Sequence, residues 1–232
     1  MTMLSVFQDV CKVIGLTVPT SVYGSTDRRH LELGALANQL ARRIAIAHDW
    51  QVLKGIATVT GDGATEDFAL PSDYERMLVK SQVWSSSLET PLTPITDADR
   101  WLGLDVQSFD FVINAWIIYG GQIHIKPALA NAVTGKFFYQ SNLIVTDADT
   151  TTKTQFDADT DVFRLDEQLL TLALIWQWRE MKGLPYAEDL ANYEILQAQL
   201  ITRDKGSRTI RVGKVRLPLD VKTAYPQAIS DS

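Results

Sequence analysis

The sequence predicts an α+β protein, in which a helical bundle carries an inserted antiparallel β region and an extended C-terminal arm. Apolar residues recur at helical spacing near the start of the chain and again close to its end. Between these segments, short alternating runs are separated by Gly, Pro and Asp, which is typical of strands joined by turns. The order helix, strand, helix therefore favours one body with strands inserted between its helices.

The expected boundaries follow from where the pattern changes. We expect a body over residues 1–202, with helices in 1–50 and 164–202 and the β region in 51–160. A chain of 232 residues is long enough to bury one sizeable core of this kind. An extended basic arm is expected over 203–232.

Composition excludes several classes of protein. The chain is 46% hydrophobic and 22% charged, which is ordinary for a soluble globular protein. Charges interrupt its apolar stretches before they reach the length of a membrane span, and the N-terminus lacks the basic start of a signal peptide. Cys11 is alone, so an intrachain disulfide is impossible and we expect folding in a reducing cytoplasm.

Two helices are predicted before the β region. The first covers 3–14 and ends at Gly15, with an apolar face formed by Val6, Val10, Val13 and Ile14. The second starts at a cap of Ser25 or Thr26, has Asp27 in its first turn and runs to about His48. Its buried stripe is expected to comprise Leu33, Leu36, Ala37, Leu40, Ile44 and Ala47.

The β region begins with GIATVT as a strand and GDGATED as a turn, followed by the alternating Phe68 and Leu70. LVKSQVW, over 78–84, is predicted to be another strand. A short helix capped by Thr96 or Asp97 comes next.

A β-hairpin is predicted around Gly120 and Gly121, because two consecutive glycines favour a two-residue turn. Its apolar contributors are expected to be Val112, Ile118, Ile123 and Ile125. TGKFFYQ is a further predicted strand, and the polar segment 146–161 is expected to be a mobile loop with little to bury.

A helical hairpin is predicted over 166–202, broken at Gly183, Leu184 and Pro185. We expect it to pack on the 27–49 helix and to bury Leu169, Leu172, Ile175 and Trp176.

The arm differs from the body in charge. Residues 203–232 contain seven Lys and Arg against three Asp and Glu, whereas 1–202 contain 15 against 25. Basic and apolar residues intermingle in the arm, which favours docking to an acidic partner or to a second copy over a merely solvated tail. The residues expected to dock are Arg203, Lys205, Arg208, Ile210, Arg211, Val212, Lys214, Val215, Arg216 and Leu217.

No motif supports catalysis, a metal or a cofactor. His30, His48 and His124 fall on different predicted elements, and no zinc spacing, phosphate-binding glycine loop or nucleophile elbow is present. Asp157, Asp159 and Asp161 have the spacing that opens a calcium loop, but Val162 and Gln168 stand where that loop needs Gly and Glu. We therefore expect a solvated acidic loop and no enzyme activity.

Several short patterns, taken in order, carry a resemblance. They are DRRHLELGALANQLARRIAIAHDW, FALPSDYERM, the Trp84 strand followed by PLTPIT, YGGQIHIKPALA, and DEQLLTLALIWQWREMKGLPYAEDLANYE. Over about residues 3–202 this succession resembles the head–tail adaptor, or connector, proteins of tailed bacteriophages. The resemblance implies a virion protein of the neck, assembled in the host cytoplasm.

In that family, subunits form a ring, commonly of twelve, beneath the portal. The resemblance implies that this ring extends the DNA channel, lets DNA pass without sequence-specific binding and offers a platform to the next tail protein. It also implies that the C-terminal segment reaches the portal. The alternatives are another tail-completion or baseplate component, a nucleic-acid-binding module that uses the arm, or a hydrolase whose carboxylates the sequence does not reveal.

Overall fold

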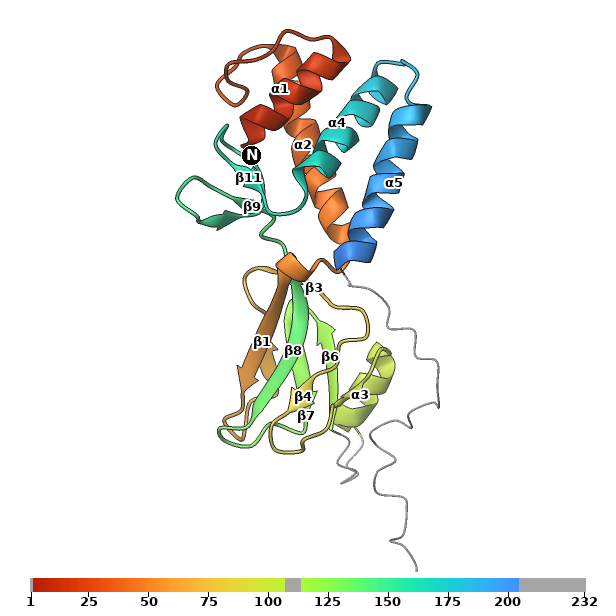
Figure 1. Ribbon diagram of the computed structural model, residues 1–232. Helices are drawn as coiled ribbons and strands as arrows, with labels where there is room; N and C mark the ends of the chain where they lie inside the picture. The colour runs from red at the N-terminus through yellow and green to blue at the C-terminus, as the bar shows by residue number, and fades with distance from the viewer. Residues whose placement is uncertain (1, 107–113, 205–232) are drawn as a thin grey trace, which may run out of the picture.

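The computed structural model describes residues 2–106 and 114–204, and it has two regions stacked end to end (Figure 1). One region contains α1 (Met3–Ile14), α2 (Arg28–Ala47), α4 (Glu167–Met181) and α5 (Ala187–Asp204). The other contains two small sheets, with α3 (Ala98–Val106) beside them. The prediction of a mixed α+β protein is confirmed.

Helix α4 lies at the centre of the helical region because it contacts α1, α2 and α5. A helix with neighbours on several sides is apolar around most of its circumference. Its buried residues are accordingly spread over several faces: Leu169, Leu170, Ala173, Leu174, Ile175, Trp176 and Trp178. Leu172, which we expected to be largely buried, is partly buried.

The ends of α1 and α2 differ in detail from the prediction. Gly15 ends α1 in the left-handed conformation, at φ 74°, as expected. Asp27, rather than Ser25 or Thr26, caps α2, since its carboxylate accepts a hydrogen bond from Arg29 N at 2.9 Å. Ser25 does not cap the helix; its hydroxyl accepts a hydrogen bond from the backbone N–H of Asp27, in the loop just before α2.

The apolar faces of α1 and α2 also need correction. Val13 is exposed on α1. On α2, Ala45 rather than Ala47 completes the buried stripe.

The first sheet of the β region has the order β1-β8-β3, and β4 also pairs with β8. These strands are β1 (Lys54–Thr60), β3 (Tyr74–Met77), β4 (Trp84–Ser85) and β8 (Thr134–Ser141). Strand β8 is the longest and pairs antiparallel with the other three. The predicted strands at GIATVT and TGKFFYQ are therefore confirmed.

The second sheet has the order β2-β7-β6-β5. Its strands are β2 (Asp67–Ala69), β5 (Thr93–Pro94), β6 (Ala115–Tyr119) and β7 (Gln122–Lys126). The predicted hairpin is confirmed, since β6 and β7 pair across Gly120 and Gly121, both of which have positive φ. Val112, which we expected in this hairpin, lies outside the described residues.

The two sheets enclose a shared apolar core that is separate from the core of the helices. Its buried members come from both sheets and their loops: Ala57, Val59, Val83, Leu92, Ile123, Ile125, Leu129, Phe137 and Tyr139. None of these residues belongs to the helical core.

The predicted strand over 78–84 is wrong. Only Trp84 of this segment lies in a strand, and the preceding strand, β3, is at Tyr74–Met77. The chain turns between them, because Ser81 N donates to Leu78 O and Lys80 has φ 66°. The apolar run resembled a strand although its backbone bonds are those of a turn.

The segment 146–161, which we expected to be a mobile polar loop with little to bury, contributes to a small sheet and buries an aromatic side chain. The segment belongs to a three-stranded sheet in the order β10-β9-β11, made of β9 (Val145–Thr146), β10 (Thr152–Lys153) and β11 (Val162–Phe163). Asp147 forms the turn by accepting from Asp149 N and Thr151 N, both at 2.9 Å. Phe156 then inserts its ring into the helical core.

Helices α4 and α5 are joined by a short turn in which Gly183 has φ 68° and Leu184 N donates to Arg179 O. Helix α5 continues to Asp204, so it includes the first two residues of the expected arm. Arg203 and Asp204 are therefore helical, and the rest of the predicted arm lies outside the described residues.

Trp176→Ala should lower the free energy of unfolding by about 3–5 kcal/mol, because large-to-small changes in a core leave a cavity. The side chain is only 6% exposed and lies between Tyr193 of α5 and the guanidinium of Arg43. Urea denaturation followed by circular dichroism measures the change. Ile195→Ala, at a position 57% exposed on α5, is the matched control and should change stability little. Equal effects of the two substitutions would contradict the packing described for α4.

Candidate functional site

The helical and β regions meet at a junction built around the end of α2. The last carbonyl groups of a helix have no partner within it. Here, Trp50 Nε1 donates to Ile44 O at 2.9 Å, and Gln140 Nε2 of β8 donates to Ala45 O and His48 O. Gln140 is almost completely buried. Strand β8 is thus hydrogen-bonded directly to the end of α2.

The same junction holds the end of α5. The carboxylate of Asp204 accepts from Gln51 N at 3.1 Å and lies 3.3 Å from His48 Nε2. Gln51 begins the short 3-10 helix η1 (Gln51–Leu53), which leads directly into β1. Asp204 therefore fixes the point at which the C-terminal segment leaves the described part of the chain, close to the start of β1.

Two further polar contacts brace the junction. Arg76 of β3 lies 2.6 Å from Asp49, whose other oxygen accepts from Val79 N. The guanidinium of Arg164 donates to Leu143 O and, at 3.0 Å, to Val52 O. Charge-assisted hydrogen bonds of this kind are stronger than neutral ones and are directional. The junction is consequently held by hydrogen bonds and ion pairs rather than by a shared apolar core.

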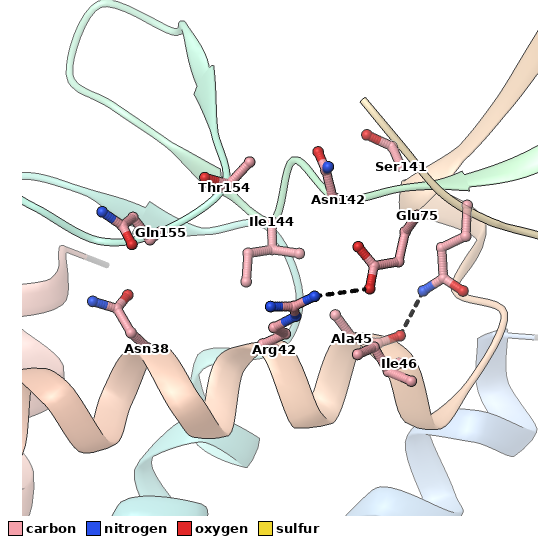
Figure 2. A pocket seen from close by; sticks show the side chains of 11 residues that line it. Asn38, Arg42, Ala45, Ile46, Glu75, Ser141, Asn142, Ile144, Thr154 and Gln155 are labelled. Atoms are coloured by element: carbon pink, nitrogen blue, oxygen red, sulfur yellow. Dashed lines mark hydrogen bonds and ion pairs between the residues drawn. The ribbon is translucent and has the colours of Figure 1, made fainter. Parts of the chain in front are cut away.

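A cavity of about 420 Å³ opens beside the junction, between α2 and the segment that follows β8 (Figure 2). The residues that line it, most of them polar in type, are Asn38, Arg42, Ala45, Ile46, Glu75, Gln140, Ser141, Asn142, Ile144, Thr154 and Gln155. Arg42 crosses it to pair with Glu75 at 3.3 Å. Asn38 closes one end by exchanging two hydrogen bonds with the backbone of Phe156, at 2.7 and 3.0 Å.

The chemistry of this cavity is that of amides and one ion pair. The residues that line it include no histidine, cysteine or aspartate. A nucleophile and a base within hydrogen-bonding distance are the minimum for covalent catalysis, and this lining does not supply them. The lining presents amide, hydroxyl and charged groups that form hydrogen bonds with polar partners.

The acidic segment 157–161 was expected to be solvated, and this is wrong for two of its carboxylates. Asp161 is 0% exposed and accepts from Asp157 N, Ala158 N and Lys153 Nζ at 2.8–3.0 Å. Asp159 accepts from Val22 N and Tyr23 N, which ties the segment to the loop before α2. Protein donors occupy the positions that a cation would need.

These contacts also change proton affinities. Burial alone would raise the pKa of Asp161. The hydrogen bonds from Lys153 and two backbone N–H groups lower the pKa by more than burial raises it, so the pKa lies below its ordinary value. The pKa of the Tyr23 hydroxyl is raised by burial and by the nearby carboxylates of Asp161 and Asp159. Among the described residues, no group of three His, Cys, Asp or Glu side chains is placed to hold a metal ion.

The three histidines lie apart, as the sequence indicates. His30 pairs with Ser25 Oγ at 2.8 Å, and His48 lies at the junction. His124 is buried on β7, where its Nδ1 lies 2.6 Å from Asp67 and its ring stacks on Tyr119 at 3.8 Å. Each histidine has a structural partner of its own.

Only Arg203 among the residues expected to dock lies within the described part of the chain. It is exposed in the last turn of α5, next to Asp204. The other predicted docking residues, from Lys205 to Leu217, lie outside the described residues. Sequence reasoning missed the junction, because the partners Gln140, Asp204 and His48 are far apart in the chain and carry no motif.

Comparison with known protein families identifies the family of this chain. The model of the SU10 adaptor protein family matches residues 1–216, which is nearly the whole chain. The chain belongs to the SU10 adaptor protein family. No curated protein matches it.

Membership of the SU10 adaptor family confirms the resemblance to phage head–tail adaptors. The family consists of structural proteins of the virion and is not known as an enzyme family. It also implies contacts with other virion proteins such as the portal and the tail. Within residues 2–106 and 114–204, no helix is long and apolar enough to cross a membrane.

Asp161→Asn should make this SU10 adaptor less sensitive to acid and less stable at neutral pH. A carboxyl whose folded pKa is lowered stabilises the fold above its unfolded pKa, near 3.9, and the effect is lost as the pH falls through the folded pKa. Removing the charge should lower the free energy of unfolding at pH 7 by about 1.5–3 kcal/mol, the range for hydrogen bonds to charged groups. Denaturation curves at pH 7 and pH 3 measure both effects.

The control for this substitution is Asp149→Asn, at an exposed position in the turn between β9 and β10. It should leave stability at pH 7 nearly unchanged. If Asp161→Asn and Asp149→Asn behave alike, Asp161 does not hold the segment together in the way described.

Proposed function

We propose that this SU10 adaptor forms a closed ring, of twelve subunits, that joins the portal to the tail and extends the DNA channel at the neck of the virion. The observation that carries the proposal is the family match over residues 1–216. Its partners would be further copies of itself, the portal and the next tail protein. DNA would pass without sequence-specific contacts.

A closed ring needs two different surfaces on each subunit, because its contacts are heterologous. The helical bundle offers one candidate at the turn between α4 and α5, where Met181, Leu184 and Tyr186 are exposed. The β region offers another on the outer face of β1 and β8, where Ile56 and Phe138 are exposed. The turn between α4 and α5 lies at the far end of the helical region, whereas β1 and β8 belong to the β region, which supports contacts between unlike faces (Figure 1).

The charge of the body supports passage of DNA. Residues 1–202 carry 25 acids against 15 Lys and Arg. Proteins bind DNA mainly by neutralising its phosphates, so an acidic lining would repel the duplex and let it slide. The basic residues are concentrated beyond residue 202, away from this excess of acid in the sequence.

The C-terminal arm is proposed to be the docking element. Because α5 runs to Asp204, we now divide the chain into a body over 1–204 and an arm over 205–232. The arm would dock on the portal or an adjacent subunit through Lys205, Arg208, Ile210, Arg211, Val212, Lys214, Val215, Arg216 and Leu217, with Arg203 at its root. The anchoring of Asp204 at the junction would set the direction in which it leaves.

Negative-stain imaging of the purified protein, alone and with portal rings, tests the ring. The expected result is a ring with twelve-fold averages, formed alone or on the portal. A protein that stays monomeric in both conditions would contradict the proposal. Rings that bind a baseplate component but not the portal would favour a baseplate role instead.

Deleting residues 205–232 should leave the body folded and abolish attachment to the portal. The truncation keeps Asp204, so its bonds to Gln51 and His48 remain. Co-sedimentation with portal rings measures attachment, and thermal denaturation shows that the body is intact. Attachment of the full chain should weaken as salt rises, because screening reduces the attraction between basic and acidic surfaces. Unchanged affinity of the truncated protein would rule out docking by the arm.

A further inference from the structure

Strand β1 lies at one edge of its sheet and has only one neighbour. It pairs with β8 along seven residues, Lys54–Thr60, in a register without interruption. No hydrogen bond from any other described strand reaches its opposite side. We call this opposite side the β1 edge.

The hydrogen bonds around β8 reveal which groups of β1 face this edge. Phe138 N donates to Ser81 Oγ and Phe138 O accepts from Leu78 N, so the backbone of Phe138 points away from β1. Phe138 lies opposite Ile56. In an antiparallel pair, two such residues both direct their N–H and C=O outward.

The same alternation assigns the rest of the strand. Gly61 N donates to Val133 O at 2.8 Å, so the odd-numbered positions of this strand face β8. Ile56, Thr58 and Thr60 therefore present their backbone N–H and C=O groups at the β1 edge.

The β1 edge lacks the usual protection of edge strands. Natural proteins block such edges with proline, a bulge or a short strand, because an open edge pairs with any extended chain. Residues 54–60 contain no proline and no bulge. Ile56 is 62% exposed and its neighbour Phe138 is 50% exposed, so an added strand would also cover apolar surface.

We propose that residues 208–217 from the C-terminal arm of a neighbouring copy add to the β1 edge as a further strand. The inference rests on the proposed assembly into rings and names the surface that receives the arm. It goes beyond docking to the portal, because the partner is a second copy of this chain.

The arm has the sequence that such an edge would accept. Ile210 and Val212 alternate with basic residues, and so do Val215 and Leu217. Gly213 lies between the two pairs and adds one residue to the alternation, so a regular strand would place the pairs on opposite faces. A β-bulge at Gly213 would return all four apolar side chains to one face. Apolar residues opposite Ile56 would form the cross-strand pairs that stabilise sheets.

Charge favours the same partner. Asp62 lies two residues beyond the end of β1. Thr65 donates to Asp62 and lowers the pKa of its carboxyl to about 2, so Asp62 is anionic. The stretch 205–217 contains five Lys and Arg, including Lys205, and no acid.

The position of Asp204 favours a second copy over the same chain. The arm leaves the body beside Gln51, three residues before β1 begins. Within one chain, only residues 205–207 would be available to bring the arm from α5 to the far side of β1. An arm of 28 residues can span roughly 90 Å when extended, at 3.3 Å per residue, which is ample to reach a neighbour.

Disulfide trapping between two populations of the full chain, assembled together with portal rings, tests the inference. One population carries Thr60→Cys, and the other carries a single cysteine at each arm position from 208 to 217 in turn. Cys11 is fully buried and does not compete. We expect crosslinks between the populations that alternate in yield along the arm and change phase at Gly213.

Thr58→Pro in the Thr60→Cys chain is the blocking variant. It removes an N–H that faces the β1 edge and leaves the bonds to β8 in place, so the body should fold normally by thermal denaturation. It should reduce crosslinking at least tenfold. Thr58→Val, which changes the side chain alone, is the matched control and should crosslink like the parent.

Three outcomes overturn the inference: no crosslink in assembled rings, crosslinks only within one chain, or equal crosslinking by Thr58→Pro and Thr58→Val. If rings form on the portal but no crosslink appears, the inference fails and the proposed function stands. If neither rings nor portal complexes form, both fail.

Discussion

The structure depends on how the end of α2 is completed. Helical carbonyl groups at this end need donors, and burying them without partners would destabilise the fold. Trp50 supplies one donor from the chain that follows, and Gln140 supplies another from β8, about ninety residues later in the sequence. This second bond joins two regions whose apolar cores are separate. A second bond from the same amide, to His48 O, strengthens this buried link between the helices and the long central strand.

The other polar contacts of the junction extend this arrangement. Asp204 ties α5 to the backbone of Gln51, and Arg76 ties β3 to Asp49. Each contact involves residues at or just past the end of a helix or in a strand beside it. The family assignment places this polar joint between two regions of a structural protein that other virion proteins contact.

The local sequence pattern was sufficient to predict most helices and strands. It was insufficient to predict which distant residues contact one another. The helix ending at Gly15 and the hairpin at Gly120 and Gly121 were predictable, because glycine conformation and periodicity act over a few residues. The segment 146–161 was not predictable in this way, since its order comes from Phe156 in a distant core and from bonds to Asn38.

The apparent strand at 78–84 failed for a related reason. Its apolar residues are typical of strands, but a turn at Lys80 prevents the backbone from continuing a ladder. The candidate site could not be predicted. Its junction brings together His48, Gln140 and Asp204, which are far apart in the sequence and belong to no recognisable motif. Ordered succession of weak patterns, rather than any single motif, was what identified the family.

The separation of the two cores has a mechanical consequence. A continuous apolar core resists deformation in every direction, whereas a few directional hydrogen bonds resist sliding more than bending. The subunit should therefore act as two stiff blocks joined by a compliant seam at residues 48–51. In an assembly that must fit components of different shape above and below it, this seam would absorb small tilts without disturbing the packing inside either block.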